Sequence, residues 1–207
     1  LAVTVPAWAQ TPAAPAAAAK VRSVLILPFT TPDLPREEAW MGEAAAQSVI
    51  TAFRQVPGVV QVDRSRLRSL PQPEAWDESG AVGVARALRA DVAIFGEVRR
   101  TGGELTIQGR WVELRGERVE RGHIDPVVVP DGGLLDRLRG VPVAYAKAIR
   151  IFVTEPEAAR MQKWAAPTAS AKAWEAYVRG CIAANRGTQD GNEAAVEHLS
   201  RAIEADA

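Results

Sequence analysis

The sequence predicts an α/β (α+β) protein: a mixed sheet of about five strands with two to three helices, followed by a carboxy-terminal helical hairpin. Two continuous apolar runs, residues 24–29 and 92–98, are typical of strands buried on both faces. Residues 105–111 alternate apolar and polar side chains, as a strand with one wet face does. Elsewhere apolar residues recur at spacings of three and four, which indicates amphipathic helices.

The strand at residues 24–29 ends in Pro-Phe and leads into a strongly patterned helix. Its first turn is expected to contain Glu37 and Glu38, where the helix dipole favours negative charge. The apolar stripe of this helix consists of Gly42, Ala45, Ala46, Val49, Ile50, Phe53 and Val56. Pro57-Gly58 ends the helix, and a second short strand follows at residues 59–62.

The middle of the chain supplies a second helix and the third strand. Residues 63–73 are polar and irregular, with one helical turn. A helix over residues 79–89 then leads into the strand at 92–98.

Glycine turns divide the next segment into antiparallel strands. Gly102 and Gly103 supply the positive-φ residues of a tight hairpin. Gly116 makes another turn, and residues 119–124 return as a last strand. The sheet therefore begins with helix-connected strands and ends as an antiparallel meander.

The carboxy-terminal third is predicted to be helical on either side of a polar connector. A helix after Gly133 should break near Pro142, because proline removes a donor and clashes with the preceding turn. Its apolar stripe is Val141, Tyr145, Ala148, Ile149 and Phe152. Residues 154–169 form the connector, and helices at 170–185 and 192–205 close the chain.

The amino terminus predicts export. Residues 1–9 are interpreted as a signal peptide remnant, because Ala7 and Ala9 form an A-x-A cleavage site. Residues 10–20 continue as a Pro/Ala linker. The expected location is periplasmic or otherwise exported, and no cysteine at the cleavage point gives a lipoprotein signal.

The overall charge disfavours a nucleic-acid partner. The 25 Lys and Arg residues balance the 25 Asp and Glu residues, so no net field gathers an anionic polymer. The mature part contains no apolar run near the ~20 residues of a membrane span. The single cysteine, Cys181, cannot form an internal disulfide.

Residues 21–153 resemble the TolB amino-terminal-like domain. The resemblance rests on the strand ending Pro28-Phe29, on Trp40-Met41-Gly42-Glu43, on Val56-Pro57-Gly58-Val59, and on Ile94-Phe95-Gly96-Glu97-Val98-Arg99-Arg100. It implies an envelope-associated interaction module without catalytic residues, more distantly similar to CsgG-like and FlgO-like proteins.

Residues 170–207 resemble the first helix pair of a tetratricopeptide (TPR) array that is expected to continue. The motif residues are Tyr177-Val178-Arg179-Gly180, Ala195, Leu199 and Ala202-Ile203-Glu204. Small residues let the helices approach closely, and Leu199 packs between them. The loop between the helices is predicted to be longer than the usual TPR turn. A single repeat cannot bury its apolar side, so further repeats of the same chain are expected partners.

No constellation for catalysis, metal binding or a cofactor is predicted, so the expected protein is not an enzyme. His123 and His198 are the only histidines and lack Cys or carboxylate neighbours at ligand spacing. Aromatic and apolar residues of the carboxy-terminal part are the candidates for binding a partner, since such side chains anchor interfaces. These candidates are Trp164, Trp174, Tyr177, Val196, Leu199 and Ile203.

The sequence thus favours a non-catalytic, extracytoplasmic scaffold module of the bacterial cell envelope that binds a protein or peptide. Two alternatives remain at this point: an accessory of outer-membrane assembly or secretion of the CsgG/FlgO kind, and the sensory arm of a cytoplasmic regulator.

Overall fold

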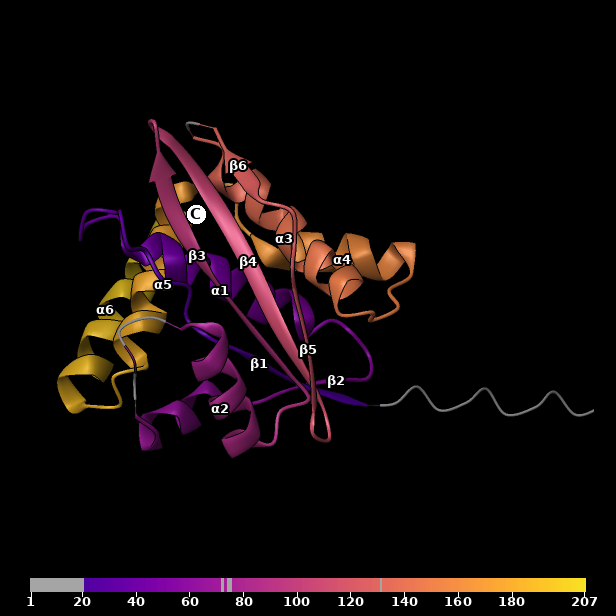
Figure 1. Cartoon of the computed structure of the whole chain (residues 1–207). Helices are drawn as coiled ribbons and strands as arrows, with labels where there is room; N and C mark the ends of the chain where they lie inside the picture. The colour runs from indigo at the N-terminus through magenta and orange to yellow at the C-terminus, as the bar shows by residue number, and fades with distance from the viewer. Residues whose placement is uncertain (1–20, 72, 74–75, 131) are drawn as a thin grey trace, which may run out of the picture.

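A six-stranded mixed sheet, with helices on both of its faces, organises the chain (Figure 1). The computed structural model describes residues 21–71, 73, 76–130 and 132–207. The architecture is the α+β class predicted from the sequence, with one strand more than the expected number. The predicted signal peptide remnant, 1–9, and linker, 10–20, lie outside the described residues.

The elements follow one another with bounds close to those expected for the strands. In chain order they are β1 (Arg22–Ile26), α1 (Trp40–Phe53), β2 (Val59–Gln61), η2 (Arg64–Ser69), α2 (Glu78–Leu88), β3 (Val92–Thr101), β4 (Glu104–Arg115), β5 (Arg118–His123), β6 (Val127–Val129), α3 (Leu134–Ala148), α4 (Glu155–Ala165), α5 (Ala171–Ala184) and α6 (Gln189–Ala205).

The strand order β2-β1-β3-β4-β5 confirms the predicted change from parallel to antiparallel pairing. β1 runs parallel to both β2 and β3, whereas β4 runs antiparallel to β3, β5 and β6. Gly102 and Gly103 turn the β3–β4 hairpin with φ of 60° and 91°. β6, which the sequence did not predict, pairs with the start of β4 and extends the edge formed by β5.

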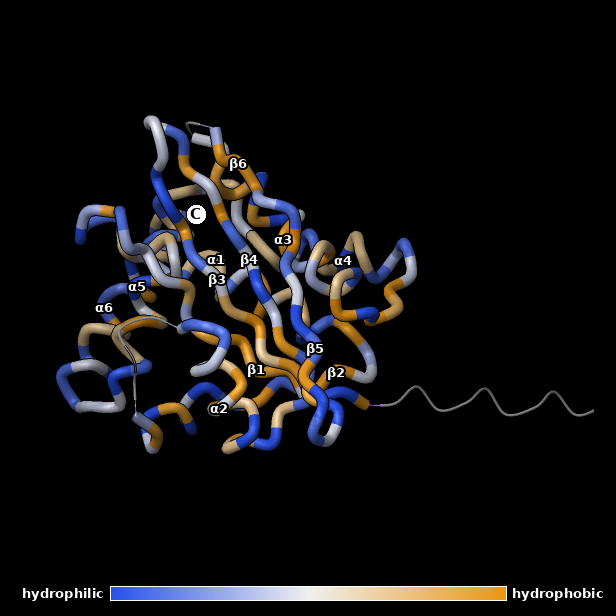
Figure 2. Tube along the Cα trace, in the orientation of Figure 1, coloured by the Kyte–Doolittle hydropathy of each residue, from blue (hydrophilic) through white to orange (hydrophobic). Residues whose placement is uncertain are grey.

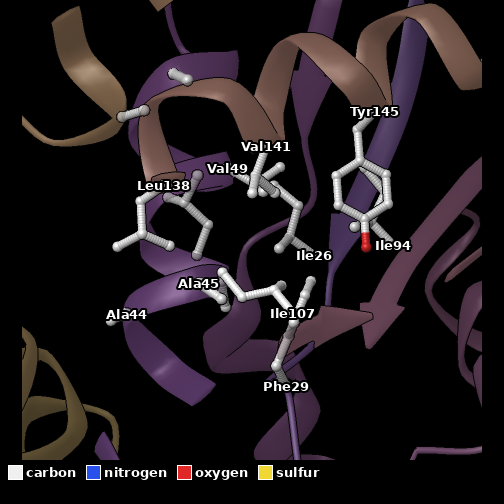
Figure 3. Close-up of a cluster of buried hydrophobic side chains, with 14 of the residues drawn as sticks. Ile26, Phe29, Ala44, Ala45, Val49, Ile94, Ile107, Leu138, Val141 and Tyr145 are labelled. Atoms are coloured by element: carbon white, nitrogen blue, oxygen red, sulfur yellow. The ribbon is translucent and has the colours of Figure 1, made fainter. Parts of the chain in front are cut away.

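The two faces of the sheet each carry a hydrophobic core, because successive side chains of a strand point to opposite faces. Val24 and Ile26 of β1 pack toward α1 and α3, while Leu25 and Leu27 pack toward α2. The hydrophobic colour accordingly gathers along β1 and the adjoining part of β3 (Figure 2). Figure 3 shows the first core, in which Tyr145 of α3 reaches down to the strands.

α1 begins later than predicted, at Trp40, and its first turn does not contain Glu37 or Glu38. Residues 35–39 form tight turns in which the Glu38 N–H donates to the Pro35 carbonyl over 2.9 Å. The Glu38 carboxylate accepts from Arg100 of β3 over 2.6 Å. An ion pair to the sheet has therefore replaced the interaction with the helix dipole.

α3 is continuous through Pro142, which corrects the predicted break. A proline inside a helix costs about 3 kcal/mol. Leu138, Val141 and Tyr145 lie on the core side of the same helix and are fully buried, and each such burial contributes about 1.5–3 kcal/mol. Packing on the sheet thus outweighs the local cost.

The stripe predicted for α3 is wrong at Phe152, which is 86 % exposed. The helix ends at Ala148, and Arg150 adopts a left-handed conformation with φ of 58°. The Ile151 N–H then donates back to the Ala146 carbonyl over 2.8 Å, as in a Schellman-type end. The chain turns away before Phe152 can join the buried face.

The predicted polar connector at 154–169 contains a helix, α4, that packs on α1 and α3. Its amino terminus is a capping box in which Thr154 and Glu157 satisfy each other's backbone and side-chain groups. Met161 and Ala165 are fully buried on its inner side. The short apolar stripe among many polar residues conceals this helix in the sequence.

α5 and α6 form the predicted helical hairpin, which lies beside α1 (Figure 1). α6 begins at Gln189, where Thr188 caps it by accepting from the Gly191 N–H. The loop is therefore only residues 185–188, shorter than the sequence suggested. Leu199 packs directly over Gly180, as predicted: a Cβ at Gly180 would approach the Leu199 Cγ to 2.8 Å.

Candidate functional site

An apolar groove of about 610 Å³ lies where the α5–α6 hairpin meets α1 and the end of α4. Its size is in the range of sites that hold small ligands or several side chains. It is lined by Thr51, Arg54, Gln55, Trp164, Pro167, Thr168, Ala173, Trp174, Tyr177, Leu199, Ala202, Ile203 and Asp206.

α5 forms the inner wall of the groove. Ser170 caps this helix by accepting from the Ala173 N–H over 3.1 Å. Trp174 and Tyr177 are three residues apart, so they lie side by side on the helix, and their rings stack with centroids 5.3 Å apart. Trp174 is only 1 % exposed and belongs to the core shared with α1.

α6 forms the outer wall. Leu199, Ala202 and Ile203 line the groove along one side of this helix. Ile203 is 75 % exposed although its side chain is large and aliphatic. Asp206 closes the end of this wall, and its Oδ1 accepts from the Thr168 hydroxyl in the connection before α5.

The remaining wall comes from the carboxyl end of α1 and from Trp164, the one aromatic residue of α4. Trp164 is 45 % exposed. Arg54 and Gln55 follow the last residue of α1 and present a guanidinium and an amide at the rim. Among the residues that the structure describes, the Arg54 side chain makes no ion pair or hydrogen bond.

A second, more polar hollow of about 430 Å³ lies on the other side of Tyr177 and shares Arg54 with the groove. Beside it, Arg64 binds Glu43 with both of its terminal nitrogens, at 2.7 and 2.9 Å. The Gln47 amide donates to the same carboxylate over 2.8 Å. These bonds join the buried Glu43 and Gln47 of α1 to the partly buried Arg64 of η2, so the set is a structural contact between the two helices.

The groups around Tyr177 favour their neutral forms. Burial raises the pKa of the Tyr177 phenol to about 12, and the adjacent Cys181 adds to this shift. Burial also raises the pKa of the Cys181 thiol, so this cysteine is a poor nucleophile at neutral pH.

An alkaline titration should show the effect of burial on both tyrosines of the chain, Tyr145 and Tyr177. Burial raises the pKa of Tyr145 well above its ordinary value, as it raises that of Tyr177. In the folded protein both pKa values exceed the unfolded value of 10.0. The stability that the neutral phenols contribute to the fold is therefore fully present below pH 10 and is lost as the pH rises above it. We expect phenolate absorbance to appear together with loss of circular dichroism. A phenolate step near pH 10 in a protein that stays folded would contradict this burial.

The structure brings five of the six predicted partner-binding residues to one groove: Trp164, Trp174, Tyr177, Leu199 and Ile203. Val196 is 66 % exposed and lies outside the groove on α6. Trp174 is a wall and core residue, so its ring is not free to insert into a partner. Sequence reasoning missed Arg54, whose only signal is a charged residue directly after the apolar stripe of α1.

The described residues offer no candidate metal centre, since no three His, Cys, Asp or Glu side chains come together in them. His123 lies at the end of β5 and His198 on α6, in separate parts of the molecule. Within the same residues, no helix combines the length and hydrophobicity that crossing a membrane requires.

No protein-family model and no curated protein matches the chain. Among solved structures, the LpoB C-terminal domain from Salmonella enterica is similar over 52 % of this chain and 85 % of that one, with 15 % identity and a TM-score of 0.35. An uncharacterized protein is similar over 63 % of this chain and 92 % of that one, with 12 % identity and a TM-score of 0.33. At these TM-scores neither likeness bears on function.

Proposed function

We propose that this protein is a non-catalytic interaction module of the bacterial cell envelope, with a TolB-like domain followed by a TPR-like helix pair. The groove between α1, α4, α5 and α6 binds an apolar segment of a protein partner. One observation carries the proposal: two large exposed side chains, Trp164 of α4 and Ile203 of α6, line the same apolar groove.

The composition of the groove supports a protein ligand. Exposed aromatic and aliphatic side chains beside a concave surface are typical of interfaces. The helices that form the walls suit a helical or extended peptide, which would lie along them as peptides lie in other helix-lined grooves. Export is supported by the A-x-A pattern at Ala7 and Ala9.

Peptide selection tests the groove. A random library displayed on phage is selected against the protein, and the peptides obtained are synthesised and titrated by fluorescence anisotropy. We expect Ile203→Asp to weaken their binding at least about tenfold, because it puts a charge into the apolar groove. The matched control is Val128→Asp, a similar change at a 46 % exposed position on β6, which should leave binding unchanged.

Equal binding to wild type and Ile203→Asp would show that the groove is not the peptide site. Export is tested separately by osmotic shock of cells that carry the complete gene. Release of the protein while a cytoplasmic marker enzyme stays inside supports export, and retention with the marker contradicts it.

A further inference from the structure

Arg54 is the arginine that lines the apolar groove, and its charge is not compensated there. Arg64 is paired with Glu43, and Arg179 binds both Glu175 and the Glu37 carbonyl. Arg54 is exposed at the end of α1, and no carboxylate of the described residues pairs with it. Its guanidinium lies where the apolar groove meets the polar hollow, next to Tyr177.

The groove therefore has two electrically different ends. The two ends are identified by their place along α5. Leu199 lies over Gly180, in the second half of α5, whereas Asp206 lies beside Thr168, before α5 begins. Arg54 and Tyr177 mark the first end, and Asp206 marks the second. A ligand carboxylate is attracted at the Arg54 end and repelled at the Asp206 end.

We propose that the groove selects an amphipathic peptide whose apolar side chains pack on Trp164, Leu199 and Ile203 and whose Asp or Glu side chain pairs with Arg54. This inference rests on the proposed function and adds the chemistry of the partner. A guanidinium presents two parallel N–H donors that match a carboxylate, so the acid also fixes the direction in which the peptide lies.

The rim favours a peptide over a lipid acid, which would offer the same combination of apolar chain and carboxylate. Gln55 places an amide with both a donor and an acceptor beside Arg54, and its side chain makes no hydrogen bond to any other described residue. A peptide backbone can pair with this amide, whereas an alkyl chain leaves it without a partner.

Parallel selections test the proposal. One phage library of random peptides is selected against wild type, against Arg54→Gln and against Ile203→Asp, each checked for its fold by circular dichroism. We expect the wild-type peptides to share apolar residues at helical spacing with an Asp or Glu at one end. Peptides selected on Arg54→Gln should keep the apolar residues and lose the acid.

Titration of synthetic peptides then gives the magnitude. Changing the acid of a wild-type-selected peptide to its amide should weaken binding to wild type about fivefold and leave binding to Arg54→Gln unchanged, as expected for a solvent-accessible pair. Decanoate serves as the lipid-like probe and should not displace the peptide.

The outcomes separate the two proposals. If the wild-type peptides share an apolar pattern that depends on Ile203 but carry no acid, the proposed role of Arg54 is wrong and the groove stands. The same holds if the acid is also selected on Arg54→Gln. If decanoate displaces the peptide at comparable concentration, the ligand is a lipid acid rather than a peptide. If the same peptides emerge from all three selections, the groove itself is not the site and both proposals fall.

Discussion

Trp174→Ala should lower the free energy of unfolding by about 3–5 kcal/mol, the range observed for removal of a buried aromatic side chain. Trp174 is 1 % exposed and packs in the core that α5 shares with α1. Its ring also supports Tyr177, on which it stacks. We expect a lower urea midpoint and loss of peptide binding, because the inner wall of the groove collapses.

Two matched variants define this effect. Trp164→Ala removes the same side chain from a 45 % exposed position and should cost less than about 1 kcal/mol, while still weakening peptide binding. Trp174→Phe keeps a ring in the core and removes an indole N–H that has no hydrogen-bond partner among the described residues. A similar loss of stability in Trp164→Ala and Trp174→Ala would show that α5 is not held by this core.

These tryptophans show where sequence reasoning stops. Both flank the same connection and both looked like interface residues by type and position. Burial separates them: one is a core residue and the other a surface residue of the same groove. That distinction depends on how α5 packs across α1, a contact between segments more than a hundred residues apart, which no local pattern encodes.

Elements with strong local signals were predicted well. The β3–β4 hairpin follows from Gly102 and Gly103, since two consecutive positive-φ residues suit few other structures. The helical hairpin follows from the spacing of small residues around Gly180. In both cases the chemistry that fixes the backbone lies within the element itself.

Elements fixed by tertiary contacts were missed or misjudged. β6 has three residues, and it is a strand because β4 offers it a free edge. α3 continues through Pro142 because its other side is buried on the sheet. α4 did carry a local signal, the Thr154–Glu157 capping box, which the polar composition of the segment obscured.

The candidate site was predicted in its apolar part only. Tyr177, Leu199 and Ile203 follow from the pattern of the hairpin, because exposed apolar positions of a lone repeat require a neighbour. Arg54 could not be assigned, since its importance comes from the absence of a charged partner in space. Charge compensation is a property of the folded surface, and at the groove it leaves the Arg54 guanidinium without a carboxylate partner among the described residues.

Gly109→Ala should destabilise the protein by about 3 kcal/mol, because a methyl group added inside a packed core forces its neighbours from their positions. A Cβ at Gly109 would lie 2.2 Å from the Tyr145 Oη and 2.8 Å from the Ile124 Cγ1. Tyr145 cannot yield easily, since it is fully buried, donates to the Phe95 carbonyl over 2.9 Å and packs edge-on against Phe29.

A glycine without neighbours provides the control. At Gly83, on the exposed side of α2, an added Cβ would meet nothing within 4 Å, so Gly83→Ala should stabilise the helix by about 0.5–1 kcal/mol. Tyr145→Phe removes the atom of closest approach to Gly109 but leaves the Cζ at 2.7 Å. In that background Gly109→Ala should therefore cost less, though not nothing, in urea unfolding. An unchanged cost would show that the strain falls on Ile124 instead, and a neutral Gly109→Ala would place α3 farther from the sheet than the Tyr145 contact requires.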